Sequence, residues 1–181
     1  MKKVALLAFA LGALSVTHAH ADLDNSLFGE IAREHGLPVN LLYSVALAES
    51  AYSSSEGISP WPYTIRTATK AYYAKTLEEA EHLLTDLLRS ARSVDVGIMQ
   101  VNLYWNSDRI NDPKSLLSAE NGLRTGASIL SERIRSAPGD LELGIGRYHN
   151  IKNEALARNY GSRVLAICKN ISYVIGGVCE Q

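Results

Sequence analysis

The stretch "LLYSVALAESAYS" (residues 41–53) most constrains the fold, because it has the apolar spacing of a buried helix and ends on a carboxylate. Leu42, Val45 and Glu49 fall on one helical face. Pro38 is expected in the first turn, where its missing N–H costs nothing. A glutamate in the last turn opposes the helix dipole, and such local violations are expected at functional sites. The alternative interpretation of Glu49 is a salt-bridged residue at a helix end.

Helical periodicity continues along most of the chain. We expect helices at 27–36, from the Thr76–Glu79 capping box onward, over 112–137, and through most of the C-terminal part. The leucine stripe that follows the capping box is predicted to be core. Two β-prone runs, Tyr63–Ala68 and Ala71–Lys75, predict a small hairpin or extended loop. The predicted fold class is therefore mainly α, with one small β element at most.

The first 21 residues have the features of a cleaved signal peptide. Lys2-Lys3 is a positive n-region, residues 4–16 form a short apolar run, and Ala19-His20-Ala21 is a small-x-small cleavage signal. The apolar run is short for a bilayer span, so we expect a periplasmic protein that starts near Asp22 and has no stable membrane insertion. The alternative is a retained N-terminal anchor.

Residues 22–181 are expected to form a single domain, with an irregular inserted segment at about 53–95. Hydrophobic residues make up 46% of the chain, as in ordinary globular proteins. Removal of two lysines with the leader changes the formal net charge from −1 to −3. This mild acidic balance speaks against a nucleic-acid partner, which requires a basic stripe.

Two cysteines, Cys168 and Cys179, lie near the C-terminus. Export would place them where disulfides persist, so a bridge is the favoured interpretation and two separate thiols are the alternative. His35, His82 and His149 show no ligand spacing with each other or with the cysteines, so no metal is expected. No phosphate-binding glycine loop or serine-hydrolase elbow is present in the sequence, and no cofactor is expected.

Three separated patches carry candidate functional residues. The first ends the apolar helix, the second is the glycine turn of "VDVGIMQVN" (94–102), and the third is "GRYHN" (146–150), with a tyrosine a short way on. Singly, each patch is as well explained by a turn, a core methionine or a surface loop. The candidates, in chain order, are Glu49, Ser50, Met99, Gln100, Tyr148, Asn150 and Tyr160.

Together, the patches resemble the lytic transglycosylases of the soluble, lysozyme-like (SLT) family, which read Glu-Ser, Gly-Leu-Met-Gln, Ala-Tyr-Asn and then a tyrosine. In this chain, His149 separates the tyrosine and the asparagine that are adjacent in the family. The stretch "INDPKSLLSAENGLRTGASIL" is similar to a further helix of the family. The resemblance covers residues 27–165 and implies a mainly α, lysozyme-like (goose-type) domain.

The resemblance implies a peptidoglycan lytic transglycosylase, which cleaves the MurNAc-GlcNAc β-1,4 bond without water and leaves 1,6-anhydromuramic ends. Glu49 would act first as acid and then as base, and the substrate's N-acetyl group would assist at the anomeric carbon. Met99 would line the pocket, and Ser50 would orient the carboxyl or the substrate. The residues implied to bind and orient the sugar are Gln100, Tyr148, Asn150 and Tyr160.

The inserted segment carries Pro60-Trp61-Pro62, which is similar to an insertion in specialised members of conjugative elements and secretion systems. The resemblance therefore implies local wall opening for such an apparatus, with glycan strands and the secretion or conjugation machinery as partners. Four aromatic residues of the segment are either sugar-stacking walls or the cover of the inserted helix. They are Trp61, Tyr63, Tyr72 and Tyr73.

Cleaving a glycosidic bond requires a proton on the leaving oxygen. The pKa of a free glutamate is about 4.3, so burial must raise the pKa of Glu49 if it is to donate a proton near neutral pH. Asp95 and Glu56 are candidates for a second carboxylate, although Asp95 also suits a cap of the Gly97 turn, which is the favoured interpretation. A firmly placed second carboxylate would favour a hydrolytic muramidase. A third hypothesis is a catalytically idle glycan-binding scaffold.

Overall fold

The computed structural model describes residues 23–180, and the predicted leader at 1–21 lies outside the described residues. Helices dominate the structure, which confirms the mainly α prediction at this level. The helices are α2 (Leu27–His35), α3 (Val39–Ser50), α4 (Leu77–Leu87), the 3₁₀ helix η1 (Pro113–Leu117), α5 (Ala119–Arg135), α6 (Leu141–His149) and α7 (Glu154–Ile175). Among residues 23–180, no helix combines the length and the apolarity that crossing a bilayer requires.

The β part is larger than the single element expected from the sequence, so that expectation is wrong. The predicted hairpin is present, with Ile65 opposite Tyr72. The same sheet contains two more strands, at 94–96 and 101–102, which are too short to show a period of two in the sequence. One sheet is β1 (Ala51–Ser54) with β2 (Gly57–Pro60). The other has the order β4-β3-β5-β6 and contains β3 (Thr64–Thr67), β4 (Ala71–Tyr73), β5 (Val94–Val96) and β6 (Val101–Asn102).

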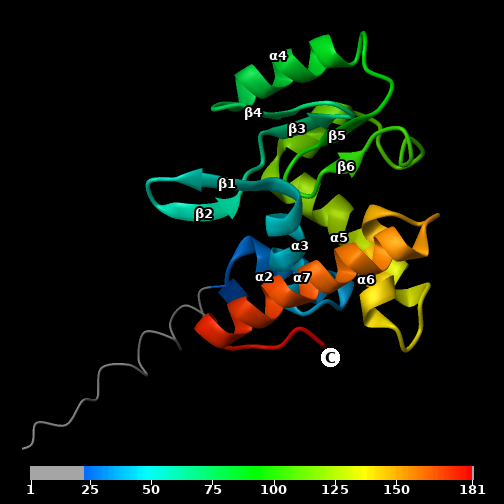
Figure 1. Ribbon diagram of the computed structural model, residues 1–181. Coiled ribbons are helices and arrows are strands. Elements are labelled where there is room, and N and C mark those ends of the chain that lie inside the picture. Colours follow the sequence, from blue (N-terminus) through cyan, green and yellow to red (C-terminus); the bar gives the residue numbers. More distant parts are fainter. Residues whose placement is uncertain (1–22, 181) are drawn as a thin grey trace, which may run out of the picture.

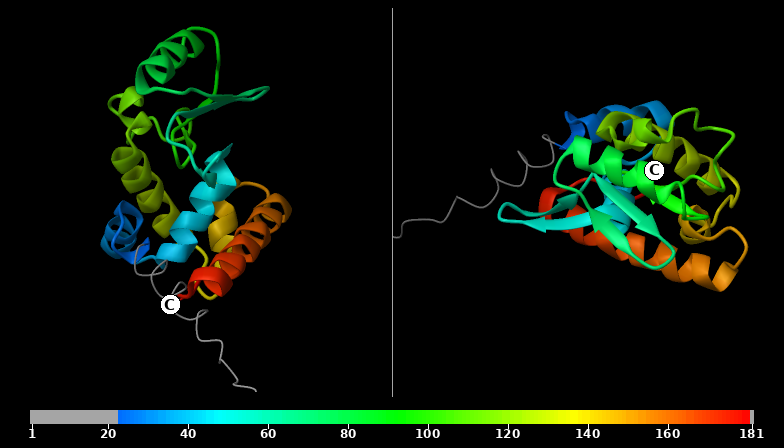
Figure 2. Two further views of the ribbon diagram at one scale, coloured as in Figure 1. Left: turned by 90° about the vertical axis from the view of Figure 1, so that its left-hand side faces the viewer. Right: turned by 90° about the horizontal axis from the view of Figure 1, so that it is seen from above.

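Two groups of elements are stacked on each other (Figure 1). Helices α2, α3, α5, α6 and α7 form one group, and the four-stranded sheet with α4 on its outer side forms the other. The hairpin β1–β2 projects to one side, and α4 lies farthest from the helical group (Figure 2). Since β1 begins at the residue after α3, the end of α3 lies where the two groups meet.

Helix α3 is buried among the other helices, as its sequence predicts. Leu42, Val45 and Ala46 have no exposed surface, and α3 contacts both α2 and α7. Pro38 lies one position earlier than predicted, at the N-cap with an extended backbone, where it still needs no N–H partner. Helix α7 is joined to the C-terminal segment by a disulfide between Cys168 and Cys179, which confirms the predicted bridge.

The segment 112–137 is not one continuous helix, contrary to the prediction. A 3₁₀ turn ends before Ser118, and the Ser118 hydroxyl accepts a hydrogen bond from the Asn121 N–H to start α5. Serine side chains compete in this way with continued helix, and helical periodicity does not register the break. Within α5, a Cβ at Gly126 would lie 2.4 Å from Met99 Cβ, so only glycine permits this approach.

The predicted leucine stripe of α4 is only partly core. Ala80 and Leu84 are fully buried, whereas Leu77 and Leu88 are each 44% exposed. The helix packs on β3 and η1 at the outer side of the sheet, so a stripe this wide exceeds the surface available to bury it (Figure 2). The predicted cap is confirmed, since Thr76 accepts a hydrogen bond from the Glu79 N–H.

Candidate active site

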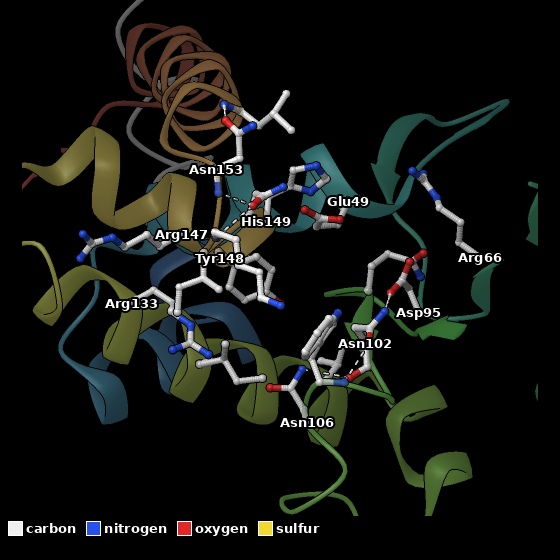
Figure 3. Close-up of a pocket in the computed structure, with 18 residues that line it drawn as sticks. Glu49, Arg66, Asp95, Asn102, Asn106, Arg133, Arg147, Tyr148, His149 and Asn153 are labelled. Carbon is white, nitrogen blue, oxygen red and sulfur yellow. Dashed lines mark hydrogen bonds between the residues drawn. The ribbon is translucent and has the colours of Figure 1, made fainter. Parts of the chain in front are cut away.

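A cavity of about 600 Å³ lies where the helical group meets the four-stranded sheet (Figure 3). Its size is in the range of small-molecule and oligomer sites. Its lining comes from α3, β3, β5, β6, α5, α6, the start of α7 and the loops next to them. The residues that line it are Glu49, Arg66, Asp95, Gln100, Val101, Asn102, Trp105, Asn106, Ile129, Arg133, Arg147, Tyr148, His149, Asn150, Ile151, Lys152, Asn153 and Leu156.

Glu49 reaches the cavity from the last turn of α3. Burial raises the pKa of Glu49 to about 7, and the nearby Asp95 carboxyl acts in the same direction. A hydrogen bond from Tyr160 and the charges of Arg66 and Arg163 oppose this rise without cancelling it. The carboxyl is therefore poised between its neutral and charged forms near neutral pH, which is what a general acid requires.

Tyr160 positions the carboxyl from behind. Its hydroxyl donates a 2.5 Å hydrogen bond to Glu49 Oε1, across 111 residues of sequence. Tyr160 is 3% exposed and does not line the cavity. The His149 ring stacks on Tyr160, with ring centroids 4.8 Å apart and planes nearly parallel, and His149 faces the cavity. Tyr160 is thus a partner of Glu49, and the prediction that it binds the sugar is wrong, because its hydroxyl is engaged by the Glu49 carboxyl and its ring is covered by His149.

Tyr148 forms part of the cavity wall and ties α6 to the segment after β5. Its hydroxyl donates a 2.7 Å hydrogen bond to the Met99 carbonyl. Met99 itself is fully buried against Gly126 and does not line the cavity. The prediction that Met99 lines the pocket is therefore wrong, because the close approach of α5 covers its side chain.

The turn that follows β5 is built as the sequence predicts. Gly97 has a φ of 82°, and Gln100 adopts a φ of 47°, which residues other than glycine seldom adopt. The Gln100 amide holds this conformation by donating to the Thr64 and Gly97 carbonyls, each at 2.9 Å. Gln100 lies at the cavity wall as predicted, with its amide N–H groups engaged by the backbone.

Ser50 has a structural contact where a role at the carboxyl was predicted. Its hydroxyl donates to the Ile98 carbonyl at 2.7 Å and accepts from the Trp61 N–H at 3.3 Å. It is fully buried and does not line the cavity. Ser50 therefore joins α3 to the turn and to the inserted segment. The prediction that it orients the carboxyl or the substrate is wrong, because these backbone partners occupy its hydroxyl.

Asp95 is a second carboxylate at the same cavity. It lies on β5 opposite Arg66 of β3, and its Oδ1 accepts a 2.6 Å hydrogen bond from Asn102. Burial raises the pKa of Asp95, and the hydrogen bond from Asn102 partly opposes that effect. The favoured prediction, a cap of the Gly97 turn, is wrong because the carboxylate is engaged by the neighbouring strand β6.

Asn150 ends α6 and borders the cavity. Its Oδ1 accepts hydrogen bonds from the N–H groups of Lys152 and Asn153, which shapes the loop before α7. Asn150 therefore borders the cavity although His149 separates it from Tyr148, and its contact with the sugar stays a prediction. Among residues 23–180, no cluster of histidine, cysteine and carboxylate side chains has a geometry that would hold a metal ion.

The four aromatic residues of the inserted segment do not line the cavity, so of their two expected roles the one as its sugar-stacking walls does not hold. Trp61 contacts Tyr52 and Tyr63, and Tyr52 in turn contacts Tyr73, so these rings pack on one another. The aromatic residue exposed at the cavity is instead Trp105, which is 63% exposed.

Several lining residues were not predicted. They come from β3, β6, α5, α6 and the loops that follow β6 and α6, so no single spacing in the sequence marks them and only the fold brings them together. Arg147 and His149 stand inside the "GRYHN" patch and had this one signal. The others are Arg66, Asn102, Trp105, Asn106, Arg133, Lys152 and Asn153.

No protein-family model matches this chain, and neither a curated protein nor a solved structure matches it. The function must therefore follow from the geometry and chemistry of the cavity and from the motifs in the sequence.

Proposed function

We propose that this protein is a peptidoglycan lytic transglycosylase that cleaves the MurNAc-GlcNAc β-1,4 bond without water. The observation that carries the proposal is Glu49, a carboxyl with a pKa of about 7, held by Tyr160 at the wall of a cavity large enough for sugar residues. The order of the sequence patches supports the same activity, since Glu49, Gln100, Tyr148 and Asn150 all border this cavity.

In the proposed reaction, neutral Glu49 donates its proton to the glycosidic oxygen as the C1–O bond breaks. The acetamido oxygen of the muramic residue stabilises the positive charge at C1. The Glu49 carboxylate then removes the proton of the 6-hydroxyl as O6 bonds to C1, which gives the 1,6-anhydro end and restores the neutral acid. Glu49 can serve both steps because a carboxyl with a pKa of about 7 can both donate and accept a proton near neutral pH.

The domain that carries this site is proposed to be lysozyme-like, of the goose-type or SLT class, since its helices enclose a glutamate at the end of a buried helix. We further propose that the leader exports the protein to the periplasm. There it would open the wall locally for a secretion or conjugation apparatus, as the proline-tryptophan-proline insertion suggests by resemblance.

A hydrolytic muramidase is the second candidate, and Asp95 is the observation that favours it. Asp95 borders the same cavity as Glu49 and is fixed by Asn102. A pair of carboxylates suits hydrolysis, in which the second one stabilises the oxocarbenium or forms a covalent intermediate before water attacks. The two candidates differ in whether removal of the Asp95 charge stops the reaction.

The deciding experiment is mass spectrometry of fragments released from purified peptidoglycan by the wild-type protein, Glu49→Gln and Asp95→Asn. A transglycosylase gives 1,6-anhydromuramic ends with the wild type and with Asp95→Asn, and no fragments with Glu49→Gln. A muramidase gives reducing ends that disappear with Asp95→Asn. Binding without cleavage by the wild-type protein contradicts both enzymes and favours a glycan-binding scaffold.

A further inference from the structure

We propose that Arg133, which lies at the side of the cavity away from Asp95, binds a carboxylate of the substrate, so that the protein selects anionic glycan over neutral glycan. The inference rests on the proposed function. It adds that recognition depends on charge carried by the lactyl side of a muramic residue. Two sources share this chemistry, a stem-peptide carboxylate and the free lactyl carboxylate that remains when a stem is removed.

The charges around the cavity are unequal. Four cationic side chains line it, against two carboxyl groups, and one of the two, Glu49, has a pKa of about 7 and is partly neutral. The other, Asp95, lies beside Arg66 at the opposite side from Arg133 and Arg147 (Figure 3). The arginine end thus has no carboxylate of its own in the cavity lining, even though the mature chain is acidic overall.

Acids on the neighbouring surface do not satisfy these arginines. The pKa of Glu132 is lowered mainly by a hydrogen bond from Arg109, and the charge of Arg133 contributes less. The Glu132 carboxylate lies 2.8 Å from the Arg109 guanidinium. Within residues 23–180, Arg133 makes no ion pair of its own, and its side chain borders the cavity.

The Arg147 side chain is anchored by Ser136 at the connection between α5 and α6. One of its terminal nitrogens donates to the Ser136 carbonyl and lies 2.9 Å from the Ser136 hydroxyl. Asp140, the acid whose pKa it helps to lower, is bound by Arg158 at 2.9 Å. The Arg147 guanidinium is thus directed away from the centre of the cavity (Figure 3), and Arg147 adds positive charge to this side while Arg133 supplies the donors for a ligand.

Lys152 lines the cavity next to Trp105. Its ammonium lies 4.5 Å from the centroid of the Trp105 ring, which is exposed at the cavity rim. Because Lys152 follows α6 and Trp105 follows β6, the contact joins the helical side of the cavity to the sheet side. An aromatic face beside cations suits a sugar ring that carries an acidic substituent.

The test measures binding in the Glu49→Gln background, where no cleavage occurs. Three tetrasaccharides of equal length are titrated by calorimetry. The first is a muropeptide tetrasaccharide with stem peptides, the second is the same sugar stripped of stems by an amidase, and the third is chitotetraose, which has no carboxylate. We expect at least one carboxylate ligand to bind about tenfold more tightly than chitotetraose, with affinity that falls as salt rises.

Arg133→Gln should weaken the carboxylate ligands about tenfold, as for one charge-assisted hydrogen bond in a partly exposed site, and leave chitotetraose unchanged. Arg133→Lys keeps the charge and should recover part of the loss. Arg89→Gln is the matched control, because its arginine side chain is 76% exposed and pairs with Asp86 on the surface of the α4 region, away from the cavity lining. Thermal unfolding of each variant checks that it folds.

Preference for the peptide-bearing ligand alone assigns the site to stem carboxylates, and tight binding of the stripped sugar assigns it to the lactyl group. Equal binding of all three ligands, or no effect of Arg133→Gln, overturns the inference. In that case anhydromuramic products from the wild type leave the proposed function intact. Absence of both binding and products removes the proposed function together with the inference.

Discussion

Replacing Glu49 with glutamine should change the pH dependence of folding in a direction set by burial of the carboxyl. Glu49 lies at the end of α3, and burial raises its pKa from an ordinary value of 4.5 to about 7. Below pH 4.5 both the folded and the unfolded chain hold the proton. Between the two values only the folded chain holds it, so each step up in pH favours unfolding until the pKa of about 7 is passed.

The magnitude follows from the same two values. A pKa difference of this size corresponds to about 3 kcal/mol at about 1.36 kcal/mol per unit. The wild-type protein should therefore lose about 3 kcal/mol of unfolding free energy, relative to Glu49→Gln, between about pH 4 and about pH 8.5. Glutamine keeps an oxygen for the Tyr160 hydroxyl and does not titrate, so the variant should be the more stable protein at the upper pH.

Urea denaturation of both proteins at several pH values, with the disulfide intact, measures this difference directly. Contributions from other titrating groups cancel in the comparison, because both chains contain them. Glu56→Gln is the matched control, since Glu56 is exposed in the turn between β1 and β2. A difference between wild type and Glu49→Gln that stays constant across this range would refute the burial of Glu49.

Three further outcomes are expected. Tyr160→Phe removes the hydrogen bond that lowers the pKa of Glu49, so the falling limb of the pH–rate profile should move up by about one unit; an unmoved limb contradicts this contact. Gly126→Ala would place a Cβ 2.4 Å from Met99 Cβ and should cost about 1–3 kcal/mol in urea unfolding; a neutral result would show that the methionine yields freely. Reducing the disulfide of α7 should lower stability by up to about 3 kcal/mol, measured by the same method, and an unchanged midpoint would exclude that contribution.

Much of the helical part could be predicted from the sequence, because its signals are local. The capping side chain of Thr76, the left-handed Gly36 after α2 and the apolar face of α3 act within a few residues of chain. The strands after Ala51 were mostly missed, since β1, β2, β5 and β6 are two to four residues long and depend on partners elsewhere.

The candidate site divides in the same way. The position of Glu49 against the helix dipole marked it in the sequence, and Tyr148 stood in a recognisable patch. The sequence did not show which of the other candidate residues border the cavity and which are structural. Burial against Gly126 decides that Met99 is core, and backbone carbonyls decide that Ser50 is structural.

The sequence by itself determined where α2 and α4 begin, that α3 is buried and that a carboxylate closes α3, because hydrophobic periodicity and capping are local. Only the tertiary structure decided that Tyr160 donates to Glu49 across 111 residues, that Asp95 borders the same cavity as Glu49, and that Arg133 of α5 and Arg147 of α6 both line it. The pKa of Glu49 is a property of that assembly, since desolvation depends on every element that excludes water from the carboxyl.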